Sequence, residues 1–307
     1  MKRILITGVS GFVGSNLVRH FSNQEGLLIF GHGRNSKPKT GEIEMISTCT
    51  TEILDELRID IVIHLAGIAH DLSNTYQPED YDRVNFQNTC NVFDVFVKSK
   101  ATKFIFLSSI KAAADTSSVP VTETIAPAPV TAYGKSKQKA EEYIQSVQLD
   151  PGKRAYILRP CMIHGQGNKG NLNLLYRYAK TGLPFPFGSF QNKRSFLSMD
   201  NLNFIIQSFM EKGIPSGIFH LSDDGYISTR DLYILIAREV GKTPSVWNLP
   251  VGVIRLLFSV VGKRAMLNKL TENMLVSNKK ISQYIPLPLP LEMYEGLRKT
   301  IKSFNGK

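Results

Sequence analysis

The chain alternates between short apolar runs and longer segments in which apolar residues recur with helical spacing. Runs rich in β-branched and aromatic residues predict strands at Lys2–Thr7, Leu27–Phe30, Ile61–Leu65, Phe104–Ser108, Ala155–Leu158 and Gly217–Leu221. Helical spacing predicts helices over Gly14–Ser22, Tyr81–Lys98, Ala132–Val147, Ser228–Val240 and Leu291–Lys302. Strands with two apolar faces occur in parallel sheets that helices cover on both sides. The pattern therefore predicts an α/β fold with a doubly wound parallel sheet.

A loop rich in Pro, Thr and Ala is expected over residues 112–129. The alternation of strands and helices is otherwise regular up to about residue 165, after which Gly and Pro interrupt it. The sequence predicts a sheet domain over residues 1–165 and a smaller C-terminal lobe over residues 166–307. Some later strands are left free to rejoin the first domain.

The most apolar later stretch, Leu249–Val261, contains Arg255 and is too short to span a bilayer. It predicts a core-facing helix. The alternative is a weak contact with a membrane surface, helped by Lys263, Arg264 and Lys269.

Composition narrows the class of protein. The apolar fraction of 42% and the charged fraction of 21% are ordinary for a globular protein. The net charge of +11 comes from scattered lysines and arginines without a nucleic-acid-reading motif. It favours a solvated basic surface together with attraction for an anionic substrate such as a pyrophosphate. The three cysteines have no metal-site spacing, and no signal peptide is recognised at the N-terminus, so we expect no metal and a reducing cytoplasm.

A glycine-rich turn follows the first strand. Gly8, Gly11 and Gly14 are spaced by three residues between this strand and a predicted helix, with Phe12 and Val13 between the last two. Gly8 permits a tight turn, Gly11 allows the backbone to approach a pyrophosphate, and Gly14 lets the helix pack close to the strand. Amides at the helix N-terminus then face the phosphates. The turn predicts a Rossmann-type domain that binds NAD or NADP.

The end of the second strand bears on the choice between these cofactors. An Asp or Glu there usually binds the ribose hydroxyls of NAD. The segment from Phe30 to Lys37 has no carboxylate, whereas Arg34 and Lys37 suit a 2′-phosphate, which favours NADP. The alternatives are that Arg34 is a surface charge, or that it stacks on the adenine of NAD.

Three polar residues lie in the order expected for a proton-transfer site. Tyr133 and Lys137 are four residues apart and share one face of a predicted helix. A nearby ammonium group stabilises a phenolate, so Lys137 is expected to lower the pKa of Tyr133 and to bond the nicotinamide ribose. Ser108 and Ser109 end the preceding strand, at the sheet edge where ligands bind.

Further motifs accompany these residues. They are Asp60–Gly67, Asn85 with Thr89, and Leu158-Arg159-Pro160 followed by His164-Gly165. With the glycine turn, the serines and the Tyr133–Lys137 segment, they resemble the extended short-chain dehydrogenase/reductases. More narrowly, they resemble the nucleotide-sugar epimerase/dehydratase family near UDP-glucose 4-epimerase-like proteins of bacterial surface-polysaccharide pathways.

The resemblance implies a role for each matching residue. Tyr133 is the acid/base, Lys137 its partner, and Ser109 the hydroxyl donor, chosen over Ser108 because Ala114 lies five positions later. Asn85 is implied to support the central helix. Implied cofactor contacts are Gly8, Gly11, Phe12, Val13, Gly14, Arg34, Leu65, Ala66, Gly67, Lys137 and Pro160. Implied contacts to a nucleotide-sugar, taken as UDP-linked, are Ser109, Asn171 and Arg194. A homodimer through the two long helices, over residues 81–98 and 132–147, is also implied.

The two residues directly after Ser109 bear on the type of reaction. The family's dehydratases have an Asp-Glu pair directly after the active hydroxyl, whereas Ile110 and Lys111 stand here, which disfavours elimination. The prediction is hydride transfer at C4 of a UDP-sugar, by a 4-epimerase or a 4-ketoreductase. A non-catalytic NAD(P)-sensing regulator is the alternative, and the intact Ser109, Tyr133 and Lys137 argue against it. His64 is interpreted as a packing residue rather than a base.

Overall fold

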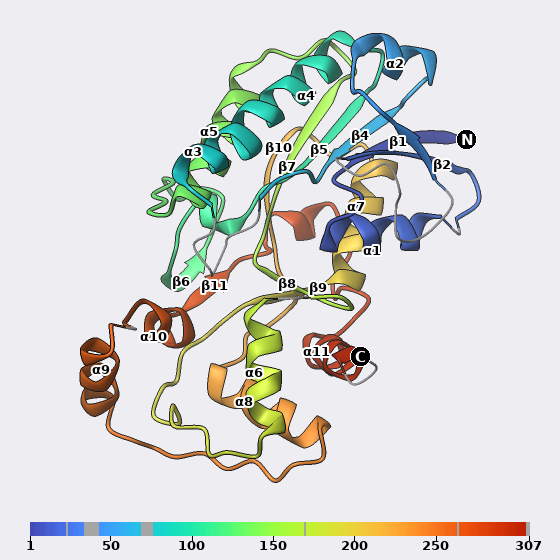
Figure 1. Ribbon diagram of the computed structural model, residues 1–307. Coiled ribbons are helices and arrows are strands. Elements are labelled where there is room, and N and C mark those ends of the chain that lie inside the picture. The colour runs from blue at the N-terminus through green and yellow to red at the C-terminus, as the bar shows by residue number, and fades with distance from the viewer. Residues whose placement is uncertain (23, 34–42, 69–75, 169, 263, 305–307) are drawn as a thin grey trace.

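A seven-stranded parallel sheet forms the centre of the molecule (Figure 1). The computed structural model describes residues 1–22, 24–33, 43–68, 76–168, 170–262 and 264–304. The strand order is β10-β7-β5-β4-β1-β2-β3. The strands are β1 (Lys2–Thr7), β2 (Leu27–His32), β3 (Glu44–Ile46), β4 (Ile61–His64), β5 (Lys103–Leu107), β7 (Arg154–Pro160) and β10 (Gly217–Leu221). The predicted α/β class with a doubly wound parallel sheet is confirmed.

Helices cover both faces of this sheet, each over its own apolar core. One core joins the sheet to helices α1 and α7, and the other joins it to helices α2, α4 and α5. These helices are α1 (Phe12–Phe21), α2 (Thr51–Glu56), α4 (Asn88–Lys98), α5 (Ala132–Ser146) and α7 (Met199–Glu211). Because β4 is buried along its whole length, its residues are apolar on both faces except at His64.

The predicted helix over residues 81–98 has a break in its hydrogen-bonding pattern. It consists of α3 (Pro78–Tyr81), the π-helical segment η1 (Asp82–Gln87) and α4. Such π-helical segments are rare and often occur at functional sites. Asn85 lies in this one and is fully buried.

The sheet reverses its strand order between β1 and β4, which lie side by side. Thr7, at the end of β1, pairs in register with His32 on β2 and His64 on β4. The carboxyl ends of these strands therefore meet at one edge. Ligands of open α/β sheets bind at such a reversal point.

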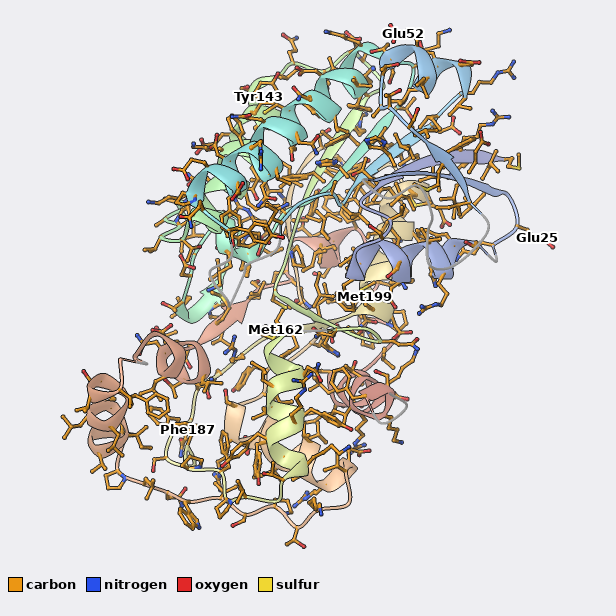
Figure 2. The ribbon with its side chains drawn as sticks, in the orientation of Figure 1. Glu25, Glu52, Tyr143, Met162, Phe187 and Met199 are labelled. Atoms are coloured by element: carbon orange, nitrogen blue, oxygen red, sulfur yellow. The ribbon has the colours of Figure 1, made fainter. Side chains whose placement is uncertain are left out.

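A smaller lobe lies below the sheet in Figure 1 and has an apolar core of its own. Its elements are α6 (Asn171–Lys180), α8 (Thr229–Glu239), α9 (Val251–Val260), α10 (Arg264–Thr271) and α11 (Met293–Phe304). Two short parallel strands, β8 (Met162–His164) and β9 (Phe196–Ser198), lie at the junction. Figure 2 shows Met162 and Met199 there, between the sheet and the lobe. β10 follows these strands in the chain but joins the main sheet beside β7. The sequence analysis had left some later strands free to do so.

Residues 112–129, expected to be a loop, contain a strand. β6 (Ser117–Val121) pairs in parallel with β11 (Met274–Val276), which the sequence analysis did not predict. A short 3-10 turn, η2 (Ile110–Ala112), precedes β6, and another, η3 (Ile281–Gln283), follows β11. β6 lies between Ser109 and Tyr133 in the chain, so this pairing joins the predicted catalytic segment to the strand that follows α10.

The prediction of a core-facing helix over Leu249–Val261 holds for only one face of α9. Ile254 is buried there against Phe190 and Leu267, but most of the other apolar residues of the helix are exposed. Among the described residues, no helix combines the length and apolar character that crossing a membrane requires.

Candidate active site

The glycine turn after β1 has the geometry that its spacing predicts. Gly8 has a φ of +73°, which disfavours other residues, and a Cβ there would lie 2.7 Å from the Ala66 nitrogen. A Cβ on Gly14 would lie 2.2 Å from the Gly8 carbonyl oxygen. The tight turn and the close approach of α1 are thus confirmed.

α1 begins directly after Gly11, which offers no side chain to cap the helix. The N–H groups of the first helical turn, including those of Phe12 and Val13, have no partner within a helix. The first turn also has no acidic residue. This N-terminus is therefore suited to an anionic group such as a phosphate.

A chain of hydrogen bonds connects the turn to the neighbouring strand and helix. The Thr7 hydroxyl lies 2.8 Å from His64 Nδ1, and His64 Nε2 lies 3.0 Å from the Thr89 hydroxyl. Because the Thr89 hydroxyl donates to the Asn85 carbonyl oxygen at 2.7 Å, it accepts the hydrogen bond from Nε2. His64 Nδ1 then accepts from Thr7, which fixes one tautomer.

His64 is neutral in this arrangement. Burial, with the nearby positive charge of Lys137, lowers the pKa of His64 to about 3. The interpretation of His64 as a packing residue is confirmed, with the addition that it orients Thr7. The Thr7 oxygen in turn accepts the N–H groups of Leu65 and Ala66 at 3.2 Å each.

Gly67 lies where three elements meet. A Cβ on Gly67 would lie 2.8 Å from Asn85 Oδ1 and 3.4 Å from Lys137 Nζ. Asn85 accepts the Ile68 N–H at 2.7 Å and donates to the Ile68 carbonyl at 3.0 Å. The π-helical segment thus fixes the strand-end loop, and the loop passes directly beside the lysine.

Tyr133 and Ser109 lie together at the carboxyl edge of the sheet. The Thr131 hydroxyl caps the first turn of α5, which carries Tyr133, and the ring of Tyr133 packs edge-on against Tyr81 with centroids 6.1 Å apart. Burial raises the pKa of Tyr133, and a hydrogen bond with Ser109 offsets part of that rise. The structure therefore brings the predicted phenol and hydroxyl into contact.

The expected effect of Lys137 on Tyr133 is wrong for this structure. The pKa of Tyr133 is raised rather than lowered, because desolvation dominates and Lys137 is not among the causes. The Lys137 ammonium instead donates to the Leu107 carbonyl at 3.0 Å and lies 4.6 Å from the centre of the Phe106 ring. Burial lowers its own pKa to about 8, and Glu141 offsets part of that shift.

A buried polar network behind the site was missed by the sequence analysis. Ser108 donates to Glu141, and Arg159 forms a salt bridge with the same carboxylate. Arg159 also lies 3.3 Å from His220 Nε2. Burial raises the pKa of Glu141, while hydrogen bonds from Arg159 and Ser108 oppose this. Ser108 is thus occupied, which agrees with the choice of Ser109 as the reactive hydroxyl.

One sequence signal could have revealed this network. Arg159 stands within the apolar run of β7, and a buried charge needs a partner. Glu141 lies four residues after Lys137 and so shares its helix face.

Arg194, which is predicted to bind substrate, lies close to the segment that follows Ser109. Arg194 forms backbone bridges to Ile227 and Met274, and burial lowers its pKa, while nearby Cys161 and Glu272 oppose this shift. Burial lowers the pKa of Lys111, two residues after Ser109, and the charge of Arg194 adds to this shift. Beside Arg194 is a small cavity of about 30 Å³, lined by Met162, Leu172, Leu175, Phe196, Thr229, Leu232 and Leu270.

Three further residues were predicted to bind substrate or cofactor. Asn171 is the first residue of α6. Pro160 ends β7 and is buried. Arg34 lies outside the described residues. Within the described part of the chain, no cluster of His, Cys, Asp and Glu suits a metal ion.

Comparison with known proteins agrees with this geometry. Residues 4–221 match the NAD dependent epimerase/dehydratase family. A UDP-glucose 4-epimerase from Vibrio cholerae is 30% identical over 315 residues, covering 99% of this chain and 95% of that protein. A UDP-2-acetamido-2,6-beta-L-arabino-hexul-4-ose reductase from Pseudomonas aeruginosa is 28% identical over 173 residues, which cover 56% of this chain and 38% of the reductase.

The fold itself recurs in a solved structure. MoeE5 in complex with UDP-glucose and NAD superposes with a TM-score of 0.80 at 19% identity, covering 99% of both chains. With a family match across most of the chain and a relative aligned over nearly all of it, the chain belongs to the NAD dependent epimerase/dehydratase family and is an NAD-dependent enzyme of the extended short-chain dehydrogenase/reductase type.

Proposed function

We propose that the protein is a UDP-sugar 4-epimerase that acts through Tyr133, Ser109 and Lys137. The observation that carries the proposal is the hydrogen bond between Tyr133 and Ser109 at the sheet edge where ligands of such folds bind. The buried Lys137 ammonium reaches Gly67 from the same helix as Tyr133. The similarity to the Vibrio cholerae epimerase over almost the whole of both chains supports the 4-epimerase reaction. The sequence resemblance further supports a place in surface-polysaccharide biosynthesis.

The residues at the sheet edge fit a dinucleotide cofactor. The uncapped N-terminus of α1 suits the pyrophosphate, with Gly8, Gly11, Phe12, Val13 and Gly14 around it. On the nicotinamide side we place Leu65, Ala66, Gly67, Lys137 and Pro160. When bound there, NAD supplies an acceptor and donor for the C4 hydride.

The chain's own residues would move the proton. Tyr133 takes the proton of the C4 hydroxyl as the C4–H bond breaks, and it returns the proton when the 4-keto sugar is reduced on its other face. Ser109 bonds both the phenol oxygen and the reacting sugar oxygen, so proton transfer needs little movement. Lys137, fixed by the Leu107 carbonyl and lying beside Gly67, would bond the nicotinamide ribose and so orient the cofactor toward the sugar. Arg194 and Asn171 hold the diphosphate and nucleotide from the lobe.

A net 4-ketoreductase that uses NADPH is the second candidate. Arg34 and the missing carboxylate after β2 favour it, as does the similarity of about half the chain to the Pseudomonas aeruginosa reductase. In that reaction Tyr133 donates its proton once and NADPH is consumed.

Incubation with nucleotide-sugars distinguishes the two reactions. The purified protein is given UDP-glucose or UDP-GlcNAc with NAD, and separately a 4-keto UDP-sugar with NADH or NADPH. Interconversion of the C4 epimers without net cofactor consumption supports the epimerase. Stoichiometric loss of NAD(P)H with the keto-sugar, and no epimer from the UDP-sugars, contradicts it.

The Tyr133→Phe variant tests the catalytic assignment itself. We expect turnover to fall at least about 100-fold while the cofactor still binds, because only the ionisable oxygen is removed. Tyr143→Phe is the matched control on the same helix, where the phenol bonds only Asp94 among the described residues. Normal turnover by Tyr133→Phe would show that another group transfers the proton.

A further inference from the structure

α9 presents an apolar stripe to solvent on the lobe. Val253, Leu256, Leu257 and Val260 are 49%, 66%, 57% and 80% exposed, and Val261, directly after the helix, is 65% exposed. Val253, the adjacent pair Leu256 and Leu257, and Val260 follow one another at intervals of three or four residues, so these four share one side of α9. We use "α9 stripe" for these five residues. Single exposed apolar residues are ordinary, but a contiguous group of this kind marks an interaction site.

The opposite side of α9 holds the helix to the lobe. Ile254 is buried, and the ring of Phe258 packs edge-on against Phe187 with centroids 5.7 Å apart. Figure 2 shows Phe187 in the lobe beside α9, and Figure 1 shows α9 at the lobe's outer edge, far from α4 and α5. Because the inner side already supplies the packing, the stripe is not needed for the fold.

Positively charged residues lie close to the stripe in the sequence. Arg255 is exposed in the middle of α9, and Lys263, Arg264 and Lys269 follow within eight residues of Val261 in the sequence. The whole chain carries a net charge of +11. Trp247, the only tryptophan of the chain, is 55% exposed four residues before α9. Tryptophan is favoured at the boundary between lipid and water.

We propose that α9 is an interfacial helix that docks the enzyme on an anionic lipid bilayer. An amphipathic helix of this kind lies in the plane of the headgroups with its apolar side about 5–10 Å deep, while cations attract the acidic lipids. A second copy of this chain fits the stripe less well, because the net charge of +11 on each chain opposes the approach of two copies. The proposal is independent of the reaction at Tyr133.

Vesicle binding by the full-length protein tests it. Vesicles of phosphatidylglycerol with phosphatidylcholine are compared with vesicles of phosphatidylcholine alone, by cosedimentation and by Trp247 emission. We expect binding to the acidic vesicles, with a shift of the emission to shorter wavelength. The double variant Leu256→Ser/Val260→Ser should weaken this binding at least about tenfold, because two apolar side chains no longer enter the lipid.

Leu183→Ser is the matched control, because Leu183 is 55% exposed elsewhere in the lobe. It should bind the acidic vesicles like the unaltered protein, and both variants should retain solution activity. Failure of the unaltered protein to bind, or equal binding by the double variant, overturns the proposal. So does self-association that the double variant abolishes without any vesicle binding, which would identify a second copy as the occupant.

Discussion

The ammonium group of Lys137 is buried beside the Phe106 ring, and this burial lowers its pKa to about 8. The unfolded chain, with a lysine pKa near 10.5, holds this proton more tightly than the folded chain does between these two values. Folding stability therefore rises as the pH rises through this window, and below it the buried charge is a full cost. Lys137, which serves the proposed chemistry, therefore lowers the free energy of unfolding at neutral pH.

Lys137→Met should therefore stabilise the protein while it abolishes turnover. We expect the free energy of unfolding at pH 7 to rise by about 1–2 kcal/mol, since loss of the Leu107 hydrogen bond offsets part of the relief. The rise in stability between about pH 8 and pH 10.5 should disappear. Urea unfolding at several pH values measures both effects. Lys135→Met, an exposed change on the same helix, should leave the pH dependence intact.

Substitutions of the two adjacent serines should have different effects, one on kcat and the other on the free energy of unfolding. Ser109→Ala should lower kcat by about 10- to 1000-fold with little change in unfolding, because Ser109 bonds the reacting phenol. Ser108→Ala should chiefly cost about 1–3 kcal/mol of stability, because it deprives the buried Glu141 of a donor. Steady-state kinetics and denaturant unfolding of both variants check the contrast. The reverse pattern would assign the reactive hydroxyl to Ser108.

At the scale of elements, the position of α5 depends on a close approach at Gly134. A Cβ there would lie 2.4 Å from the Lys111 carbonyl oxygen and 2.9 Å from Pro129 Cβ. Lys111 follows Ser109 closely in the chain, and Gly134 follows Tyr133. The glycine therefore sets the distance between the segments that carry Ser109 and Tyr133.

Gly134→Ala should lower both stability and kcat. Helix propensity alone would favour alanine by about 1 kcal/mol, so a loss of about 1–3 kcal/mol would measure the displaced contact. Thermal unfolding and turnover are the measurements. Gly213→Ala, where a Cβ meets nothing within 4 Å, should change stability by less than about 0.5 kcal/mol. An unchanged kcat in Gly134→Ala would mean that α5 tolerates the shift.

Across the whole molecule, local pattern predicted the sheet well and predicted distant pairing poorly. β1 and β10 have the predicted bounds because each is a short apolar run between turn residues. β6 and β11 escaped prediction because each forms only with a partner more than 150 residues away. The glycine turn and Tyr133–Lys137 were recognisable because their chemistry fixes residue type and spacing. The buried Arg159–Glu141 pair depends on tertiary contact, so spacing alone did not reveal it.

This buried pair joins β5, α5, β7 and β10 through Ser108, Glu141, Arg159 and His220. Arg159→Met should cost about 3–5 kcal/mol, because Glu141 is left as an uncompensated buried charge. Adding Glu141→Gln should recover part of the loss, and a double-mutant cycle by urea unfolding measures the coupling. Arg154→Met, at the exposed start of the same strand, serves as control. Equal and additive losses would show that the pair is not coupled.

The pairing of β6 with β11 has a mechanical consequence. The segment between Ser109 and Tyr133 pairs with β11 in its middle, at Ser117 and Val121. β11 also bonds the backbone on both sides of Arg194. We therefore expect that a ligand bound at Arg194 would act through β11 on the segment that joins Ser109 to Tyr133, so that binding at Arg194 and the alignment of these two side chains would change together.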